Sequence, residues 1–436
     1  MQVLEGGADC GFFLEDRLED AFRETAFGPQ DRGLLSELTR GVTRWRRTLD
    51  WVIAGASARG LPKSRTGLNI LRLGVYQLLW LDRIPDHAAV SESVELAKRC
   101  GARRLAPYIN GTLRGIQRDR DSWEERLRNL SEEDPSVAHS HPEALFRKWA
   151  RDWGRSVAIS LMEWNNRPPK LYARMRVEDP MRGSVLKAWR DAGWDGEPLR
   201  FEGIDAFEFL QVPEGMAPRT APGFEEGRLY FQDPSAALAP ALAAPSPGER
   251  ILDFCAAPGG KATALAQIAG DLATVVAYDA QPQRLSRVAE NAKRMGLESI
   301  QVVDSESALV SMVETQGGFD RVLVDAPCAN TGVLRRRVDA RWRLNAKERK
   351  RLVALQSSLL DRVAPLVRPG GSIVYSTCSL EPEENEGVTA DFVKRRADFG
   401  LAMSQRMAPW LTQTDGAYVA VLVSNAGNPE EVGQEP

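Results

Sequence analysis

The stretch ILDFCAAPGGK, residues 251–261, joins a short apolar strand pattern to a turn that contains two adjacent glycines. Five more apolar segments follow it, namely ATVVAYD (273–279), SIQVVD (299–304), RVLVDAP (321–327), SIVYSTC (372–378) and YVAVLVS (418–424). Helical patterns lie between most of them, and strands that alternate with helices form parallel sheets with both faces covered. Residues 234–426 are therefore predicted to form an α/β domain.

Carboxylates and thiols stand at the ends of the predicted strands. They are Asp253, Cys255, Asp279, Asp304, Asp325, Cys328 and Cys378. In a sheet of this kind, ligands bind outside the carboxyl ends of the strands. One such strand ending is expected by chance, but a series of them indicates a site.

The turn after the first strand suits a ligand that contains adenosine. Gly259 and Gly260 let the backbone approach a ligand, and the start of the next helix offers amide donors. The turn is not a phosphate-binding P-loop, because positions 255 and 262 hold Cys and Ala where that motif requires Gly and Ser or Thr. Asp279, 20 residues after Gly259, is placed to bind ribose hydroxyls, and Asp304 to accept from an adenine amino group. S-adenosylmethionine fits this pattern better than a dinucleotide does.

Two thiols close neighbouring strand patterns, Cys328 in DAPC and Cys378 in STC. A lone buried cysteine is usually a small core residue, but two at adjacent strand ends beside a methyl donor indicate chemistry. A thiolate that adds to C6 of a pyrimidine makes C5 nucleophilic enough to accept a methyl group. A second group must then help to remove the C5 proton. Spacing alone does not rank the two thiols in these roles.

The rest of the chain divides by its pattern. Residues 1–130 read as all-helical, because apolar residues recur at steps of three and four. Residues 131–142 are polar and turn-rich and are predicted to be a linker. Residues 143–233 begin helically and continue as a mixed α+β region, and residues 427–436 are predicted to be a disordered tail.

Composition bounds the class of protein. The net charge of −3 at pH 7 excludes a global basic field. Five cysteines, an odd number without a CxxC motif, predict free thiols in a reducing cytoplasm rather than a disulfide scaffold. No apolar run approaches the roughly 18 residues of a membrane span, and no signal peptide is evident. His139 and His141 have no cysteine nearby, so no metal site is expected.

Basic character is local. The segment 32–47 contains Arg44, Arg46 and Arg47 around Trp45, and the segment 335–351 contains Arg335, Arg336, Arg337 and Arg341 around Trp342. Arginines interleaved with an aromatic residue can hold RNA phosphates and stack a base. The alternative is a solvated helix face. The second segment begins seven residues after Cys328, which favours an RNA-facing rim.

Several motifs together resemble the RNA cytosine-C5 methyltransferases. They are LDFCAAPGGK, DAPC followed by Thr331-Gly332, and YSTCSLEPEENE (375–386). DRGLLSELTRGVTRWRRTLD (31–50), RLGVYQLLWLDRIPDHAAVSESVELAK (72–98) and INGTLRGI (109–116) resemble the helical RNA-binding domain shared with the antitermination factor NusB. HPEALFRKWARDWG and NNRPP resemble the segment before the catalytic domain. The resemblance covers nearly the whole chain and is strongest to the RsmB branch, which modifies 16S ribosomal RNA.

The resemblance implies a multidomain fold and a role for each site residue. A NusB-like all-α domain, a small α+β region that binds RNA, and a Rossmann-like class I methyltransferase domain are expected. Cys378 would be the nucleophile and Cys328 would assist product release. S-adenosylmethionine would be held by Cys255, Ala256, Ala257, Pro258, Gly259, Gly260, Lys261, Asp279, Asp304 and Asp325. Asp325 is also a candidate to touch the cytosine.

The expected function is therefore methylation of cytosine C5 in 16S ribosomal RNA by a cytoplasmic monomer. The alternatives are the same chemistry on tRNA or large-subunit rRNA, and a catalytically idle RNA-binding assembly factor.

Overall fold

A computed structural model describes residues 1–5 and 13–425 of the chain. By their contacts the residues form two compact units. The first, here called the helical unit, comprises Met1–Pro168 and Leu334–Leu344. The second, the sheet unit, comprises Pro169–Val333 and Asn345–Pro436. The predicted tail, 427–436, lies outside the described residues.

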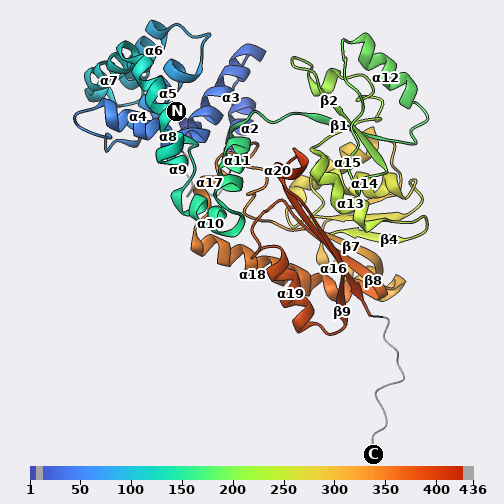
Figure 1. The fold of residues 1–436 in the computed structure, drawn as a ribbon. Coiled ribbons are helices and arrows are strands. Elements are labelled where there is room, and N and C mark those ends of the chain that lie inside the picture. Colours follow the sequence, from blue (N-terminus) through green and yellow to red (C-terminus); the bar gives the residue numbers. More distant parts are fainter. Residues whose placement is uncertain (6–12, 426–436) are drawn as a thin grey trace, which may run out of the picture. The chain divides into compact units, whose positions relative to one another are not determined.

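The helical unit follows from the apolar steps of three and four residues in its sequence. Its α-helices are α1 (Gln2–Glu5), α2 (Leu14–Glu24), α3 (Pro29–Arg44), α4 (Arg46–Ala56), α5 (Arg65–Trp80), α6 (Asp86–Arg99), α7 (Ala106–Arg118), α8 (Arg120–Glu133), α9 (Pro135–Ala138), α10 (Glu143–Trp153), α11 (Arg155–Asn166) and α17 (Ala340–Arg343) (Figure 1). Helices α3 to α8 bury their apolar faces in one core, which includes the fully buried Val52, Ile70, Ile109 and Leu113. Helix α2 packs in a separate cluster with Val3 and Val338. The predicted all-helical amino-terminal region is confirmed.

Residues 131–142, predicted to be a linker, are part of the helical unit instead. Helix α8 continues to Glu133, and α9 begins after Asp134, whose Oδ1 accepts from the backbone nitrogens of Ser136 and Val137 at 3.1 Å. The Asp-Pro pair that resembles a turn is therefore a helix cap. His141 is fully buried, and burial lowers its pKa well below the usual value. The predicted mixed region 143–233 also divides, because its first two helices belong to this unit.

The sheet unit contains two sheets. An antiparallel sheet has the order β2-β1-β3, and a larger one has the order β6-β5-β4-β7-β8-β10-β9. The strands are β1 (Tyr172–Arg176), β2 (Phe207–Gln211), β3 (Tyr230–Phe231), β4 (Arg250–Asp253), β5 (Thr274–Tyr278), β6 (Ile300–Val303), β7 (Phe319–Asp325), β8 (Val367–Thr377), β9 (Phe399–Met407) and β10 (Ala417–Ser424). The helices are α12 (Arg182–Asp191), α13 (Leu238–Ala243), α14 (Gly260–Ile268), α15 (Leu285–Arg294), α16 (Glu306–Gln316), α18 (Ala346–Val363), α19 (Glu386–Arg395) and α20 (Pro409–Thr412).

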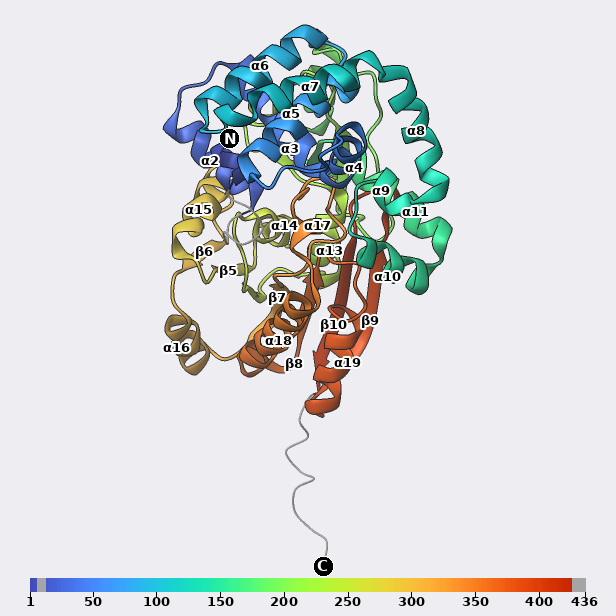
Figure 2. The same ribbon diagram turned by 90° about the vertical axis from the view of Figure 1, so that its left-hand side faces the viewer.

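The larger sheet is parallel from β6 to β8 and antiparallel at β10 and β9, which lie beside β8 in Figure 2. Ile251 belongs to one buried cluster with α14 and α15, whereas Leu252 belongs to another with α18 and α19. Successive strand residues thus face opposite covered sides. The predicted α/β domain is confirmed, but its last segment pairs antiparallel, and β9 was not predicted because its outward side chains are polar or exposed.

The order of the strands creates a site at one edge. The chain proceeds from β4 outward to β5 and β6, and then returns to the other side of β4 as β7. Loops that leave a sheet in opposite directions at such a point open a crevice beyond the carboxyl ends of the strands. No helix in the described part of the chain is long and apolar enough to cross a membrane.

Candidate active site

The turn between β4 and α14 is shaped by its two glycines. Gly259 has a φ of +106°, a backbone conformation that residues other than glycine rarely adopt. A Cβ at Gly260 would lie 3.0 Å from Cε1 of Tyr230 and 3.1 Å from Oε1 of Gln232. The backbone of this turn is therefore in close contact with β3 and the residue after it.

A cavity of about 200 Å³ lies against this turn. It is lined by residues 230–232, Ala236, residues 255–258, Gly260, Lys261 and Asp325. Of these lining residues, the sequence predicted residues 255–258, Gly260, Lys261 and Asp325 to bind the donor. It did not predict a role for β3. The strand β3 has two residues and no sequence pattern of its own, so only the fold brings it to the site.

Acidic side chains surround the turn. Asp253 is fully buried, neither of its carboxylate oxygens has a hydrogen-bond partner among the described residues, and burial raises its pKa to about 7. Asp279 is also buried and accepts from the backbone nitrogens of Ala257 at 3.2 Å and Gln281 at 2.9 Å. This acidic surface suits a ligand that has hydroxyl donors and a positive charge. Asp304 is exposed, and no described contact joins it to the turn.

Lys261 forms an ion pair with Asp325 across the cavity. Its Nζ lies 2.5 Å from Oδ2 of Asp325, whose Oδ1 accepts from Oγ of Ser376 at 3.3 Å. Burial alone would lower the pKa of Lys261, but the charges of Asp325 and Asp253 outweigh it and raise that pKa. The ion pair therefore links the glycine turn to the ends of β7 and β8.

The two thiols meet. The strands β7 and β8 are neighbours, as expected, with Asp325 opposite Ser376. The Sγ atoms of Cys328 and Cys378 lie 3.2 Å apart. Asn330 holds both residues, because its Oδ1 accepts from Sγ of Cys378 at 3.3 Å and its Nδ2 donates to the carbonyl of Cys328 at 2.8 Å.

The environment of Cys328 favours its protonated form. The hydrogen bond with Cys378 and burial both raise the pKa of Cys328 well above its usual value. Beneath it, Oε2 of the fully buried Glu384 accepts from the backbone nitrogen of Ala329 at 2.8 Å and from Nε2 of Gln356 at 3.0 Å. Burial raises the pKa of Glu384 to about 7. No sequence pattern marked Asn330, Gln356 or Glu384 as site residues.

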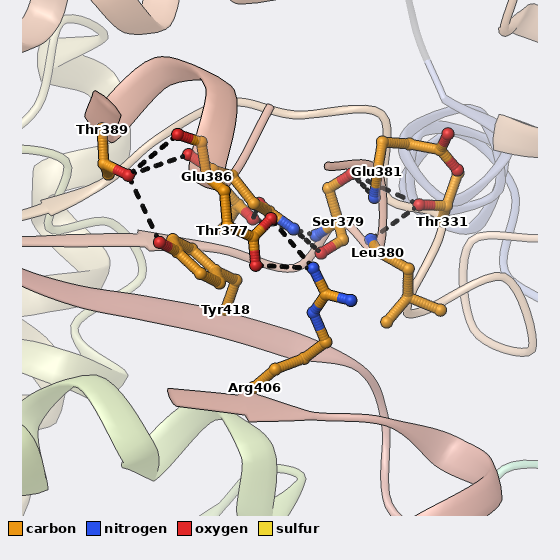
Figure 3. Close-up of polar contacts among 10 residues, drawn as sticks. Thr331, Thr377, Ser379, Leu380, Glu381, Glu386, Thr389, Arg406 and Tyr418 are labelled. Carbon is orange, nitrogen blue, oxygen red and sulfur yellow. Dashed lines mark hydrogen bonds and ion pairs between the residues drawn. The ribbon is translucent and has the colours of Figure 1, made fainter. Parts of the chain in front are cut away.

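The loop after Cys378 is tied to the loop after Cys328. Oγ1 of Thr331 accepts from the backbone nitrogen of Leu380 at 2.9 Å and lies 3.3 Å from Oγ of Ser379 (Figure 3). The backbone nitrogen of Gly332 donates to the carbonyl of Cys378 at 2.9 Å. These contacts fix the two thiol-bearing loops with respect to each other.

Further along the same loop, Figure 3 shows the ion pair of Arg406 with Glu386 at the start of α19. In the same figure Thr389 lies 3.3 Å from the hydroxyl of Tyr418. The first two turns of α19 are thereby joined to β9 and β10.

Arg174, on β1, was also missed. Its guanidinium is fully buried and donates to the carbonyl of Gly260 at 2.8 Å, to Oγ1 of Thr263 at 3.2 Å and to Oε1 of Gln267 at 3.0 Å. Burial lowers its pKa to about 9. The alternating pattern 171–177 gave no signal for it, because Arg174 shares its phase with Arg176, on the face opposite the apolar Ala173 and Met175.

Three of the arginines predicted to contact RNA are buried. The exposed fraction is 0% for Arg341, 2% for Arg335 and 8% for Arg44. Arg341 donates within the helical unit to the carbonyls of Arg44, Ser140, Asn165 and Leu334 and to Oδ1 of Asn166. The guanidinium of Arg335 lies 4.3 Å from the ring of Trp164. The prediction was wrong for these three, because they satisfy carbonyls and aromatic faces inside the fold.

The other four predicted arginines keep some exposure. Arg46 is exposed, and its guanidinium lies 5.4 Å from the ring of Trp342. Arg47, Arg336 and Arg337 are half-buried. Contact of these four with RNA stays a prediction.

Comparison with known proteins shows which families the sequence matches. The family described as 16S rRNA methyltransferase RsmB/F matches residues 240–423, and the NusB family matches residues 2–118. Ribosomal RNA small subunit methyltransferase B of Escherichia coli O17:K52:H18 is 37% identical over 402 residues, which cover 90% of this chain and 91% of that protein.

Two solved structures share the fold. The crystal structure of PH0851 has a TM-score of 0.73 and 22% identity, and the match covers 94% of each chain. NSun6 from Pyrococcus horikoshii, solved with SFG, has a TM-score of 0.55 and 20% identity, and the match covers 66% of this chain and 99% of that one. At these identities the likeness shows the fold alone.

Proposed function

The chain belongs to the RsmB/F family of 16S rRNA methyltransferases and is an S-adenosylmethionine-dependent RNA methyltransferase, and we propose that its target is C5 of a cytosine in 16S ribosomal RNA. The observation that carries this proposal is the thiol pair, Cys328 and Cys378, beside the glycine turn. Methylation of a ring carbon that is not nucleophilic requires such a thiol, whereas methylation of an oxygen or an exocyclic nitrogen does not. We further propose that the protein works as a monomer in the cytoplasm.

The residues at the turn fit S-adenosylmethionine. The cavity along residues 255–258, Gly260 and Lys261 would hold it, with the nearby Asp279 as the acceptor for ribose hydroxyls. The buried carboxylates of Asp253 and Asp279 lie beside the turn, and Lys261 is already paired with Asp325, so these acids can face a positive sulfonium ion. When bound, the donor supplies an activated methyl group. Asp304, which is exposed, remains a candidate for the adenine amino group.

In the proposed mechanism the thiolate of Cys378 attacks C6 of the cytosine, so that a bond forms from Sγ to C6 and C5 becomes nucleophilic. C5 then takes the methyl group, and the electron pair of the methyl–sulfur bond stays on the donor's sulfur, which leaves as a neutral thioether. Cys328 assists release: its thiol gives its own proton to solvent, and its Sγ then takes the proton from C5. The electron pair of the C5–H bond restores the ring double bond, the bond from Sγ of Cys378 to C6 breaks, and Cys378 leaves as thiolate. The target base must leave its stack to reach the thiols.

Two features support this division of roles. The raised pKa of Cys328 keeps that thiol protonated, which disfavours it as the attacking group. Cys378 is the more exposed of the two thiols and is therefore the one that a base entering from solvent can reach.

Incubation with S-adenosylmethionine labelled in the methyl group tests the function. Naked 16S rRNA, small-subunit particles, 23S rRNA and tRNA are the acceptors, and bisulfite sequencing maps the product. The proposal predicts label in 5-methylcytosine at one site of 16S rRNA. Label in tRNA or 23S rRNA instead would overturn the target, and binding without transfer to any RNA would favour an idle assembly factor.

A further inference from the structure

One end of the helical unit gathers several helix termini. Helix α4 ends at Ala56, and α5 begins at Arg65. Helix α6 ends at Arg99, and α7 begins at Ala106. Because short connections join α5 to α6 and α6 to α7, and these helices contact one another along their length, the segments 57–64 and 100–105 lie at the same end (Figure 1).

Contacts made by the adjoining helices α5 and α7 bring these segments together. The hydroxyl of Tyr108 donates to the carbonyl of Gly60 at 2.7 Å and lies 3.0 Å from Oγ of Ser57. At the start of α5, a Cβ at Gly67 would lie only 2.5 Å from Cδ1 of Leu105. The two connections therefore form one continuous surface.

This surface is strongly basic. Residues 57–66 contain three cations and no acid, and residues 98–108 contain four cations and no acid. Six of the seven are exposed and form no ion pair among the described residues, namely Arg59, Lys63, Arg65, Arg99, Arg103 and Arg104, which we call the basic end. The seventh, Lys98, pairs with Glu95, and the nearby Glu5 accepts from Oγ1 of Thr66 at 2.7 Å.

Other arginines of the same unit are engaged with acids. Arg72 is held by Asp50 at 2.7 Å, and Arg40 by Glu15 at 2.6 Å. An exposed cation without a carboxylate partner costs little to bring to a phosphate, because no existing ion pair has to be broken. The contrast identifies the basic end as the surface of this unit that suits a polyanion.

We propose that the basic end binds phosphates of the RNA substrate. This inference rests on the proposed function, since the polyanion is taken to be the ribosomal RNA that the sheet unit methylates. The aromatic side chain closest to the cations, Tyr108, has its hydroxyl engaged within the unit, so the surface holds the backbone rather than reads a base. Its contribution is therefore independent of sequence and dependent on salt.

The test compares three triple variants in the full chain. One is Arg99→Gln, Arg103→Gln, Arg104→Gln, and another is Arg59→Gln, Lys63→Gln, Arg65→Gln. The matched control is Arg23→Gln, Arg118→Gln, Arg128→Gln, which removes the same charge from exposed arginines elsewhere on the helical unit. Filter binding to a 16S rRNA transcript is measured at salt concentrations from about 50 mM to about 200 mM.

The logarithm of the binding constant falls as the logarithm of the salt concentration rises. Each variant of the basic end is expected to make this slope shallower by about 2 to 3, because each phosphate contact contributes about 0.7 to 0.9. The control should keep the wild-type slope. Wild-type slopes in the basic-end variants, or an equal loss in the control, would overturn the inference, including the case in which this surface binds a protein. Failure of the proposed function is distinguishable, because it would appear as absent methyl transfer by the wild type whatever its slope.

Discussion

Glu384 shows how a residue that never reaches the surface can set the geometry of a thiol. Its carboxylate holds the backbone nitrogen of Ala329, the residue after Cys328, and it does so while fully buried. Local strand patterns placed each thiol at the end of a strand, and the structure shows that the two strands, β7 and β8, are neighbours. The sequence did not indicate Glu384, because residues 381–386 contain four glutamates and no local pattern distinguishes Glu384 from the other three.

The pH dependence of stability tests this environment. Burial raises the pKa of Glu384 from an ordinary value near 4.5 to about 7, so the native state favours the protonated acid. The contribution of Glu384 to the free energy of unfolding is then fully present below pH 4.5 and is lost as pH rises through 7, by about 3 kcal/mol at most. We expect Glu384→Gln to match the wild type at pH 5 and to be more stable at pH 8.

Urea unfolding at the two pH values measures this difference. Asp253 has a pKa raised in the same direction, so the variant should lose about half of the pH dependence rather than all of it. An unchanged dependence would mean that Glu384 is ionised in the native protein.

At the scale of elements, the small sheet supports the turn that we propose to bind the donor. Arg174 reaches from β1 to three acceptors spread along α14, and a Cβ at Gly260 would meet Tyr230 of β3. Periodicity predicted a half-buried strand at 171–177 but did not say which helix it would face. That pairing depends on contacts between segments about 90 residues apart, such as Arg174 and Gln267.

Replacement of Arg174 tests this support. Arg174→Met leaves the carbonyl of Gly260 and the side chain of Gln267 without their donor, and we expect the dissociation constant for S-adenosylmethionine to rise about tenfold or more. Arg176→Met, two positions along the same strand and only half-buried, is the matched control. Calorimetric titration with the donor, and separately with RNA, reports the effect.

A selective loss of donor affinity is the expected outcome, with RNA affinity unchanged. Arg174→Lys keeps the charge but reaches fewer acceptors, so it should fall between the wild type and the methionine variant. Equal donor affinity in all four proteins would show that Arg174 serves only the stability of the fold.

At the scale of the whole molecule, the chain is not divided as its sequence texture suggests. Residues 334–344 lie within the catalytic region of the sequence but belong by their contacts to the helical unit. Arg341 anchors them through five acceptors, and Trp342 donates to the carbonyl of Thr43 at 2.7 Å. A basic segment near a site suggests RNA contact, and only the long-range contacts reveal that it is an internal anchor.

The anchor can be tested by stability. Arg341→Met removes a fully buried donor and leaves several carbonyls unpaired, so we expect the helical unit to lose about 3 kcal/mol or more. Arg337→Met, at a half-buried position of the same segment, should lose less than about 1 kcal/mol. Hydrogen exchange followed by mass spectrometry localises the loss, which should appear in α3 and α11. Equal protection in the two variants would contradict the anchor.

The central claim is that Cys378 bonds to the RNA and that Cys328 assists its release. The direct measurement is incubation of Cys328→Ala with S-adenosylmethionine and 16S rRNA, followed by electrophoresis under denaturing conditions. We expect a protein–RNA adduct that survives denaturation, and we expect no adduct in either Cys378→Ala or the double variant. An adduct that forms only when Cys378 is removed, or full methylation by Cys378→Ala, would contradict the account.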